Sequence, residues 1–288
     1  KAVEELMGIE PPLRAEYIRI IMMELQRIAS HLLGGVAFFA NDLGVTNAFA
    51  YGWRDRERVT DLLEATSGAR LLYNSYFRFG GVRHDLPSNF VKRCRETMAY
   101  LEPKIAEYEE LLDESELFIM RTKDVGILKK DDAINLGATG PVLRGSGVKV
   151  DMRKLEPYSI YDRFDFEIPV RPEGDCYARY RIRIEEMKQS IKIINQALDA
   201  LPEGEIIAKV PRFIKPPKGE VYSRIESPRG ELTVYLVSDG TDKAYRVKIR
   251  SPAFCNLSIL PHLVKGAKLQ DIIAILGSLD PVFGEVDR

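Results

Sequence analysis

The sequence has few of the residues that bind metals or form covalent cross-links, with only three cysteines and three histidines among 288 residues. The cysteines are about eighty residues apart and include no CxxC pair, and the histidines are equally scattered. This spacing excludes a disulfide framework and a run of metal ligands. The six residues are Cys94, Cys176, Cys255, His31, His84 and His262.

An excess of one charge and long apolar runs are also missing. The 42 basic and 43 acidic residues leave a net charge of -1, and without a basic block no nucleic-acid partner is expected. Every apolar stretch is interrupted by charge before the ~20 residues that a membrane-spanning helix needs.

The motifs GxSxG, GxxxxGK and HExxH are absent, so nothing supports a serine nucleophile, a P-loop or a zincin site. The chain starts at Lys1 in a segment of helical character, and we expect that an N-terminal portion is missing.

What the sequence does contain is a set of long segments with apolar residues at helical spacing. The first carries Ile18, Ile21, Leu25, Ile28 and Leu32 in alternating steps of three and four. The second opens with a charged RDRER run that we expect to face solvent. Apolar stripes this wide must bury one another, so the sequence predicts a helical bundle. The predicted helices are 12–44, 54–79, 88–115, with a kink at Pro103, and 175–201.

The remaining segments have a different character. Residues 122–174 are rich in Gly, Asp and Pro, and we expect loops whose backbone turns contact something closely. Alternating patterns at 221–227, 231–238 and 244–250 predict two or three antiparallel strands. We therefore predict a mainly α fold with a small antiparallel β-sheet, in a single domain. Its parts are the helical bundle at 12–118 and 175–201, the inserted loop region at 122–174, the β region at 219–250, and a C-terminal helix at 256–276 followed by a non-helical tail, DPVFGEVDR, which together make up 256–288.

Asp42 is the most informative carboxylate. It closes the first predicted helix after a run of apolar and small residues, and Gly34, Phe38 and Asp42 are spaced at i, i+4 and i+8 on one helical face. A flat apolar ligand could lie along such a face with the acid at its polar head. The alternative is that the segment 41–44 simply forms a C-terminal cap and turn.

Arg83, His84 and Asp85 form a second cluster, in a tight turn after a double glycine. A histidine beside a carboxylate can move protons near neutral pH, and the alternative is a structural turn with a local ion pair. The Gly-rich stretch GATGPVLRGSG lacks the strand-to-helix setting of a nucleotide-binding loop. We interpret His31 and His262 as packing residues and assign no chemistry to the charged runs RDRER and EMKQSIKII.

Six stretches, in order along nearly the whole chain, resemble the D-type (49-kilodalton-type) subunit of respiratory complex I. That family shares its fold with the large subunit of nickel-iron hydrogenases, in which a C-terminal DPCxxC supplies two nickel ligands. Here the corresponding residues are Val282 and Glu285, and an isopropyl group and a carboxylate do not replace thiolates. The resemblance therefore implies a hydrogenase-type helical bundle without a nickel-iron centre. The stretches are RAEYIRIIMMELQRIASHLL, SGARLLYNSYFRFGGVRHDLP, LGATGPVLRGSGVKVDMRK, EGDCYARYRIRIEEMKQSIKII, IESPRGELTVYLVSDG and GSLDPVFGEVDR.

The resemblance also implies a function, as a subunit of a proton-translocating NADH:quinone oxidoreductase that is active only in the complex. In the family, a helix face that matches Gly34, Phe38 and Asp42 lines a quinone cavity, and the tail at Val282 and Phe283 lines it from the other side. Asp42 matches an acid that partners a histidine on an N-terminal hairpin, which is absent from this sequence. Asp42 is therefore the expected catalytic residue.

The implied chemistry depends on other chains. Quinone is the expected substrate, this chain alone is expected to bind no cofactor, and electrons would come from a 4Fe-4S cluster in a small iron-sulphur subunit. Other expected partners are the remaining peripheral-arm subunits and the membrane-arm subunit that completes the quinone tunnel. The expected location is peripheral, on the cytoplasmic side of the cell membrane, or on the matrix or stromal side in an organelle. Many family members carry a histidine near the cluster where this chain has Leu72 or Tyr73. Candidates for the proton and cluster environment are thus Tyr73, Arg83, His84 and Asp85.

Three alternatives remain open. The same subunit could serve a ferredoxin- or deazaflavin-dependent quinone or phenazine oxidoreductase, because the electron-input module lies on other chains. It could be a non-catalytic hydrogenase-like scaffold, which predicts no cavity between the first helix and the tail. It could also be a nickel-iron enzyme, which the finding of stoichiometric nickel would support.

Overall fold

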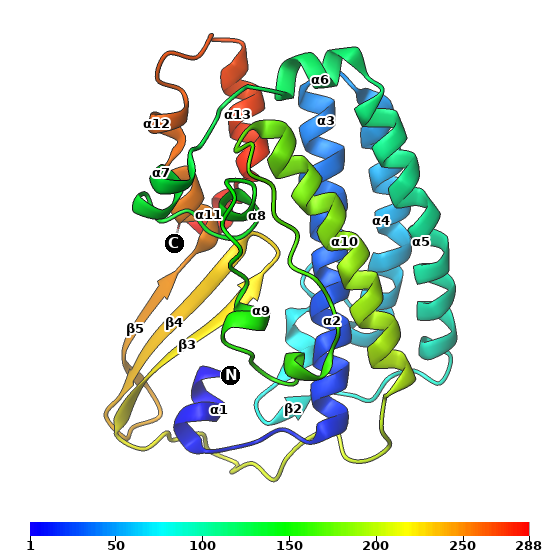
Figure 1. Cartoon of the computed structure of the whole chain (residues 1–288). Helices are drawn as coiled ribbons and strands as arrows, with labels where there is room; N and C mark the ends of the chain where they lie inside the picture. Colours follow the sequence, from blue (N-terminus) through cyan, green and yellow to red (C-terminus); the bar gives the residue numbers. More distant parts are fainter. Residues whose placement is uncertain (288) are drawn as a thin grey trace.

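The computed structural model describes residues 1–287. Four long helical segments pack against one another, and a three-stranded sheet lies on one side of them (Figure 1). This arrangement confirms the predicted mainly α fold with a small antiparallel sheet. Within the described residues, no helix combines the length and the apolar character that crossing a membrane requires.

The first long helix is assembled from three consecutive elements without a break. They are the α-helix α2 (Leu13–Ser30), the π-helix η1 (His31–Phe38) and the short α-helix α3 (Phe39–Asp42). The extent agrees closely with the prediction of 12–44. The predicted apolar stripe is fully buried, at Ile18, Ile21, Leu25, Ile28 and Leu32. The π-helical turns were not predicted.

The second helix, α4 (Thr46–Ser67), begins and ends earlier than predicted. It ends because Gly68 adopts a left-handed conformation with φ 77° and donates its N–H to the carbonyl of Glu64, as a glycine after a helix commonly does. The segment after it forms a 3-10 turn and a small hairpin instead of helix. These elements are η2 (Tyr73–Tyr76), β1 (Phe77–Arg78) and β2 (Gly81–Val82).

The charged run at the start of α4 does not face solvent as a whole. Asp55 is completely buried and Arg56 is 7% exposed. Asp55 accepts hydrogen bonds from Tyr100 at 2.8 Å and from Tyr108 at 2.7 Å, which joins α4 to the third helix. The prediction of a solvent-facing run was therefore wrong for these two residues.

The third and fourth helices, α5 (Phe90–Asp113) and α10 (Cys176–Asp199), match their predicted positions. Helix α5 continues through Pro103 as one helix. Asp175 caps the start of α10 by accepting the N–H of Ala178 at 2.7 Å. Their buried stripes face the other helices of the bundle, through Phe90, Cys94, Met98, Leu101, Ile105 and Tyr108 on α5 and through Tyr180, Ile184, Met187, Ile191, Ile194 and Leu198 on α10.

Short helices fill the segment between α5 and α10. They are α6 (Glu116–Thr122), α7 (Lys130–Asn135), α8 (Gly140–Arg144), α9 (Met152–Leu155) and η3 (Tyr161–Arg163). Gly140 has φ 61°, and a Cβ there would lie 2.4 Å from the Cα of Gly230. This contact confirms the expectation of close backbone approach in the region.

The sheet has the order β3-β4-β5 and is antiparallel throughout, as predicted. Its strands are β3 (Gly219–Ser227), β4 (Gly230–Ser238) and β5 (Ala244–Arg250). Helix α1 (Ala2–Met7) packs against β3 and β4.

The C-terminal prediction was wrong in two respects. The expected helix over 256–276 is divided into α11 (Pro252–Leu257), α12 (Leu260–Leu263) and α13 (Asp271–Leu279). The tail, expected to be non-helical, contains one helical turn, α14 (Phe283–Val286). The last residue of the tail motif, Arg288, lies outside the described residues.

Candidate functional site

Asp280, at the start of the C-terminal tail, contacts the turn between β3 and β4. It ends α13 in a left-handed conformation with φ 53°, which Asp tolerates better than most residues, and is 6% exposed. Arg229 donates from Nη2 to the Asp280 carboxylate at 3.1 Å and from Nε to the Asp280 carbonyl at 3.0 Å. Because Arg229 lies in the turn between β3 and β4, the sheet sets the position of the tail.

The tail contacts the first helix at Gly34, within the π-helix η1. A Cβ on Gly34 would lie 2.1 Å from Oδ1 of Asp280, so any larger residue would have to displace the Asp280 carboxylate. At the next residue, a Cβ on Gly35 would lie 2.7 Å from Cδ of Arg183 on α10. The two glycines therefore let both the tail and α10 reach the backbone of η1.

The π-helix changes the helical face on which the sequence prediction relied. In a π-helix the hydrogen bonds join residues five apart instead of four, so each turn holds more residues than in an α-helix. Gly34 is buried against the tail, while Phe38 is 44% exposed and Asp42 is exposed. The three residues follow one another along the helix, but only the last two are open to a ligand from outside this chain.

The structure contains the turn that the sequence suggested at residues 41–44, but the Asp42 side chain makes no hydrogen bond in it. Gly44, with φ 93°, donates its N–H to the carbonyl of Asn41 at 3.0 Å. The carboxylate of Asp42 makes no hydrogen bond or ion pair with residues 1–287. A capping role therefore does not account for an acid at this position.

An aromatic cluster stands next to Asp42. The ring centroids of Phe38 and Phe49 are 5.7 Å apart, those of Phe38 and Trp53 are 6.2 Å apart, and those of Phe49 and Trp53 are 6.1 Å apart. The edge-on contacts fix the ring of Phe38 while leaving part of it exposed. This surface is aromatic, and Phe38 is four residues from the unpaired carboxylate of Asp42.

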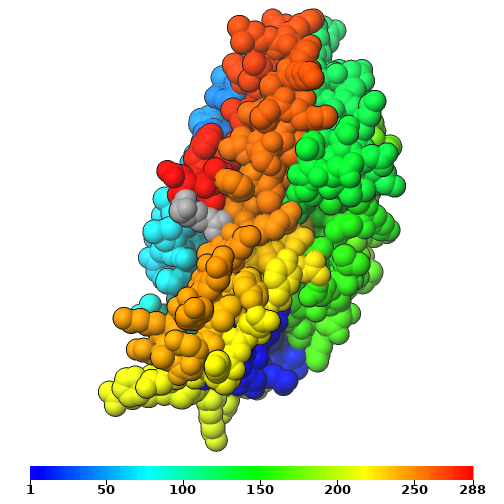
Figure 2. Space-filling view, turned by 90° about the vertical axis from the view of Figure 1, so that its left-hand side faces the viewer, coloured from blue at the N-terminus to red at the C-terminus, as the bar shows by residue number. Residues whose placement is uncertain are grey.

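The tail lies on the same side of the molecule as this surface. Figure 2 shows the red tail between a light-blue region, from the segment near residue 50, and a cyan region, from the segment near residue 75. Val282 is half-buried and Phe283 is 62% exposed. Val282 is two residues from Asp280, and the contact of Asp280 with Gly34 holds it beside the first helix. Among residues 1–287, no three His, Cys, Asp or Glu side chains form a group that could hold a metal ion.

Tyr73 is half-buried, and the charges of Arg56 and Arg229 act on its hydroxyl group. Burial raises the pKa of Tyr73, and the nearby guanidinium groups of Arg56 and Arg229 only partly oppose the effect. Tyr73 is therefore a neutral phenol at physiological pH. Leu72 beside it is 75% exposed.

Arg83, His84 and Asp85 lie elsewhere. Asp85 accepts from Arg14, at the start of α2, at 2.8 Å, and from its neighbouring backbone N–H on Leu86 at 2.7 Å. Arg14 and Asp42 lie near opposite ends of the first helix, roughly 40 Å apart at the helical rise per residue, and Figure 1 shows β2 at the lower end of that helix. The structure thus separates this cluster from Asp42 and favours a structural turn, but the ion pair of Asp85 is with Arg14 on the first helix and is not local.

A buried charge network, which the sequence did not indicate as such, lies behind the π-helix. Arg144 is fully buried and donates to Glu186 on α10 at 2.6 Å and to Glu226 on β3 at 2.8 Å. Glu186 also contacts Nε2 of His31 at 2.9 Å. Since burial keeps the pKa of His31 low and an ionised carboxylate only accepts hydrogen bonds, the neutral ring of His31 donates from Nε2.

The two carboxyl groups that share Arg144 have opposite pKa shifts. For Glu186, burial would raise the pKa, but the charge of Arg144 and the hydrogen bond from His31 outweigh burial and hold the pKa well below its usual range. For Glu226, burial prevails over Arg144, and the neighbouring charge of Asp151 raises the pKa further. Glu186 is therefore the ionised partner of Arg144, and Glu226 takes up a proton more readily.

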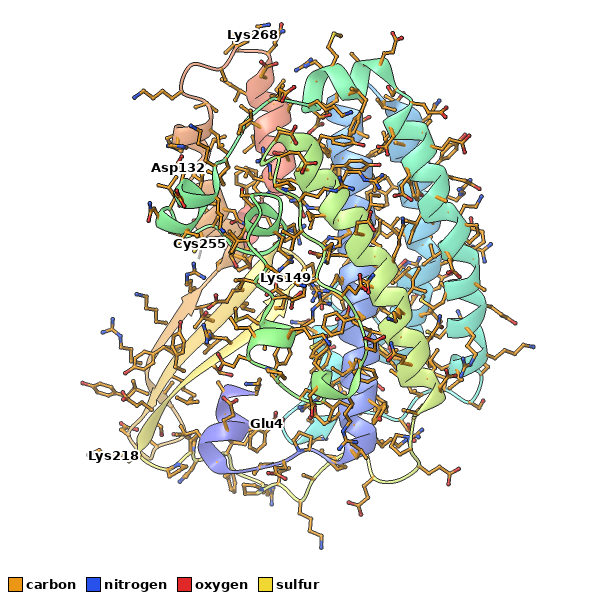
Figure 3. All side chains as sticks on the ribbon, in the orientation of Figure 1. Glu4, Asp132, Lys149, Lys218, Cys255 and Lys268 are labelled. Carbon is orange, nitrogen blue, oxygen red and sulfur yellow. The ribbon has the colours of Figure 1, made fainter. Side chains whose placement is uncertain are left out.

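The network extends along α2 to Glu24, two turns before His31. Arg153 donates to Asp151 at 2.7 Å and to Glu24 at 3.1 Å, and Glu24 also accepts from Tyr161 and Ser190, both at 2.6 Å. Figure 3 shows Lys149 between the bundle and the sheet, on the segment that carries the arginines of this network. The network thus links α2, α10, β3 and the segment around α8 and α9.

Sequence reasoning passed over Arg229, Asp280 and the network because no local motif distinguishes them. Arg229 follows a proline at a predicted turn, and Glu186 lies in a charged helical run to which we had assigned no chemistry. The retained Asp280-Pro281 pair was the one available signal. His31 is buried as expected, although its Nδ1 has no hydrogen-bond partner among the described residues.

Comparison with known proteins places the chain among subunits of quinone oxidoreductases. A family described as "Respiratory-chain NADH dehydrogenase, 49 Kd subunit" matches residues 42–216 and 210–288. The chain is 55% identical over 288 residues to the D-type subunit of NADH-quinone oxidoreductase from Dehalococcoides mccartyi, covering all of this chain and 78% of that protein. It is 51% identical over 287 residues to the corresponding protein of Geobacillus kaustophilus, covering 99% of this chain and 78% of that protein. The H-type subunit of NAD(P)H-quinone oxidoreductase from Synechococcus sp. is 47% identical over 311 residues, with coverages of 100% and 79%.

Proposed function

Because the chain belongs to the family of the 49 Kd subunit of respiratory-chain NADH dehydrogenase, we propose that it acts as this subunit in a proton-translocating NADH:quinone oxidoreductase. The observation that carries the proposal is the identity of 50 to 55% with D-type subunits of NADH-quinone oxidoreductases, over essentially the whole chain. The names of those relatives include NADH and quinone, which are the reductant and the oxidant that we propose for the assembled enzyme.

We place the quinone head group between the Phe38 surface and the C-terminal tail. Phe38 and Phe283 are exposed aromatic side chains, and Val282 is a half-buried apolar one. Such side chains suit the flat, apolar ring and prenyl chain of a quinone. The pairing of Asp280 with Arg229 supports the placement, because it holds the tail against the first helix.

Asp42 is the residue that we assign to the polar end of the quinone. Reduction of a quinone to a quinol consumes two electrons and two protons, so a carboxylate near the carbonyl oxygens can position or supply a proton. The Asp42 carboxylate is exposed and uncommitted to any described residue. This availability fits a group that acts on a ligand or on the histidine that the family carries on its N-terminal hairpin.

The electrons must come from outside this chain. We propose that a small iron-sulphur subunit carries the 4Fe-4S cluster that reduces the quinone, that other peripheral-arm subunits deliver electrons to it, and that a membrane-arm subunit completes the quinone tunnel. The protein would then lie peripherally on the cytoplasmic side of the membrane, or on the equivalent face in an organelle. This chain contributes the wall of the site and its electrostatics.

The test is the quinone reductase activity of the complex that carries Asp42→Asn. The amide keeps the size of the side chain but cannot supply a proton, so we expect turnover with NADH and quinone to fall by about tenfold or more. Activity with an artificial acceptor that takes electrons before the quinone should stay unchanged. Asp131→Asn, at an exposed carboxylate on α7, is the matched control. Unchanged quinone turnover in Asp42→Asn would contradict the proposed role.

The alternative of a nickel-iron enzyme makes a different prediction. The side chains of Val282 and Glu285 provide no thiolate, and soft metal centres depend on thiolates. Elemental analysis of the purified complex should therefore find iron but no stoichiometric nickel. Nickel at one equivalent per complex would overturn this part of the proposal.

A further inference from the structure

Arg179 and Arg183, one turn apart on α10, are buried cations with little counter-charge. Among residues 1–287, five arginines are at most 2% exposed, and three of them pair with a carboxylate at 3.3 Å or less. Within the same residues Arg179 forms no ion pair, and the carboxylate oxygen nearest to Arg183 is Oδ2 of Asp280, 4.0 Å from its Nε. Burial of a cation with so little counter-charge is unfavourable, so the position of these two arginines needs an explanation. The three paired arginines are Arg27, Arg144 and Arg153.

Both arginines donate to Ser278, near the end of α13. Arg179 donates from Nε to the hydroxyl oxygen of Ser278 at 2.9 Å, and Arg183 donates from Nη2 to its carbonyl at 2.8 Å. Cations at the C-terminal end of a helix also interact favourably with the helix dipole. Figure 1 shows α13 beside the start of α10. Since Ser278 is two residues before Asp280, α10 holds the chain at the place where α13 ends and the tail begins.

The two guanidinium groups are themselves held in place. Arg179 donates from Nη1 to the carbonyl of Gly174 at 2.8 Å and from Nη2 to the carbonyl of Gly126 at 3.0 Å. Arg183 donates from Nη1 to the carbonyl of Arg179 at 3.1 Å, and its Cδ would lie 2.7 Å from a Cβ on Gly35 of η1. These contacts fix Arg183 between α13 and η1, and its buried Nε has no acceptor among the described residues.

The Asp280 carboxylate lies between two guanidinium groups. Its Oδ1 accepts from Arg229, on the turn between β3 and β4, at 3.1 Å. Its Oδ2 is buried without a donor among the described residues and lies 4.0 Å from the equally unpartnered Nε of Arg183. Burial lowers the pKa of Arg183 although the charges of Asp280 and Glu186 oppose it, and the nearby charges of Arg179 and Arg229 add to the effect of burial. The carboxylate is therefore attracted both from the sheet and from α10.

We propose that Arg183 is a positioning residue for the C-terminal tail, which it holds from the side of α10 through the end of α13 and the Asp280 carboxylate. Arg179 supports it by fixing the same end of α13. In this way α10, in addition to the sheet, sets where Val282 and Phe283 stand. A gain in the placement of the tail accounts for the cost of burying these cations. The inference rests on the proposed function in one respect, namely that the tail lines the quinone site.

Two substitutions at position 183 test the role of the charge. Arg183→Met removes the cation and keeps an unbranched stem, whereas Arg183→Lys keeps a cation that can donate to Asp280 or to Ser278. In the assembled complex we expect Arg183→Met to raise the KM for quinone about fivefold or more and to change kcat by less than about twofold, because a displaced tail weakens binding. Arg183→Lys should regain most of the wild-type KM. Electron transfer from NADH to an acceptor that acts before the quinone should stay unchanged in both variants.

The control is Arg181→Met. Arg181 lies on the same helix but pairs with Glu109 at 2.7 Å and with Asp113 at 2.6 Å, both on α5, so its loss should leave the KM for quinone unchanged. A KM for quinone in Arg183→Met that equals the wild-type value would overturn the proposal. Equal KM values above the wild type in Arg183→Met and Arg183→Lys would also overturn it, because the charge would then not matter. The proposed function is judged separately, by the quinone turnover of the wild-type complex and of Asp42→Asn.

Ser278→Ala covers the case in which Arg183→Met fails to assemble. It removes the hydroxyl oxygen that accepts from Arg179, and it leaves both cations in place. We expect the KM for quinone to rise about twofold or more. Ser258→Ala, at an exposed hydroxyl that donates to the carbonyl of Cys255, is the control. Equal KM values in the two serine variants would contradict the inference.

Discussion

The carboxylate of Asp280 occupies the space that a side chain at position 34 would need. A Cβ on Gly34 would lie 2.1 Å from Oδ1 and 2.6 Å from Cγ of Asp280. Two segments nearly 250 residues apart in the sequence are therefore packed to backbone contact, and Arg229 holds the acid there. This contact between an acid and a glycine acts together with the Arg229 pair to set the position of the tail.

The first prediction concerns Gly34→Ala. The added methyl group must displace the Asp280 side chain and the tail that follows it, and overpacking of this kind typically costs about 1–3 kcal/mol of stability. We expect lower quinone reductase activity in the complex, with normal activity toward an acceptor that takes electrons before the quinone.

The double variant Gly34→Ala with Asp280→Ala separates the steric effect from any other cause. If the clash is responsible, the alanine at 34 should reduce activity less in the Asp280→Ala background than in the wild type. Additive effects of the two substitutions would show that the contact between these residues is not what matters.

The second prediction compares two carboxyl groups that share Arg144. Glu186 is the ionised partner, so Glu186→Gln leaves the buried guanidinium without its main counter-charge, a change that typically costs about 3–5 kcal/mol. Glu226 has a raised pKa, so a neutral amide resembles its protonated form and Glu226→Gln should be tolerated better. Urea denaturation at neutral pH measures both free energies of unfolding.

The control for this comparison is Glu57→Gln. Glu57 is an exposed partner of Arg70, and loss of a surface ion pair of this kind changes stability by about 0–1 kcal/mol. Equal destabilisation by Glu186→Gln and Glu226→Gln would contradict the conclusion that Glu186 is ionised and that Glu226 takes up a proton more readily.

The third prediction is a loss of stability in acid that depends on Asp151. Burial would raise the pKa of Asp151, but Arg153 and Arg144 outweigh burial and lower the pKa from 3.8 to about 2. Because the folded state holds the proton less tightly than the unfolded state, the contribution to stability is complete above about pH 4 and is lost as the pH falls toward 2. The contribution is on the order of 2 kcal/mol.

Denaturation curves at several pH values between 2 and 5 check this expectation. The wild-type free energy of unfolding should decline over that range, and Asp151→Asn should be less stable at pH 5 and should decline less. A variant with the same acid dependence as the wild type would show that other carboxylates account for the slope.

The sequence predicted the long helices because each of them carries its own signal. Ile18 to Leu32 repeat at helical spacing, and Asp175 supplies a cap, so local pattern and tertiary burial agree. The early end of α4 was also encoded, since Gly68 is the type of residue that stops a helix. The prediction ran past Gly68 because apolar residues continue after it.

The site residues were harder to predict because distant parts of the chain create them. The need for glycine at Gly34 comes from Asp280, and the burial of Arg56 comes from the way that α4 packs beside the loop at Tyr73. The π-helix lies in a run of small residues where α10 and the tail both approach. The helix propensities of those residues do not indicate such long-range contacts. Asp42 and Phe283, by contrast, could be singled out from the sequence, and both are exposed, although their roles stay predictions.

The buried charges around Arg144 and Arg153 also have a consequence for how the chain folds. Their carboxylate partners lie on α2, on the segment around α8 and α9, on α10 and on β3. The two arginines therefore have all their partners only when these four segments have come together. A partly folded chain in which the sheet has not yet docked would leave a guanidinium in an apolar interior without Glu226. Partial structures of this kind are penalised, and the bundle and the sheet are expected to form and to unfold in one cooperative transition.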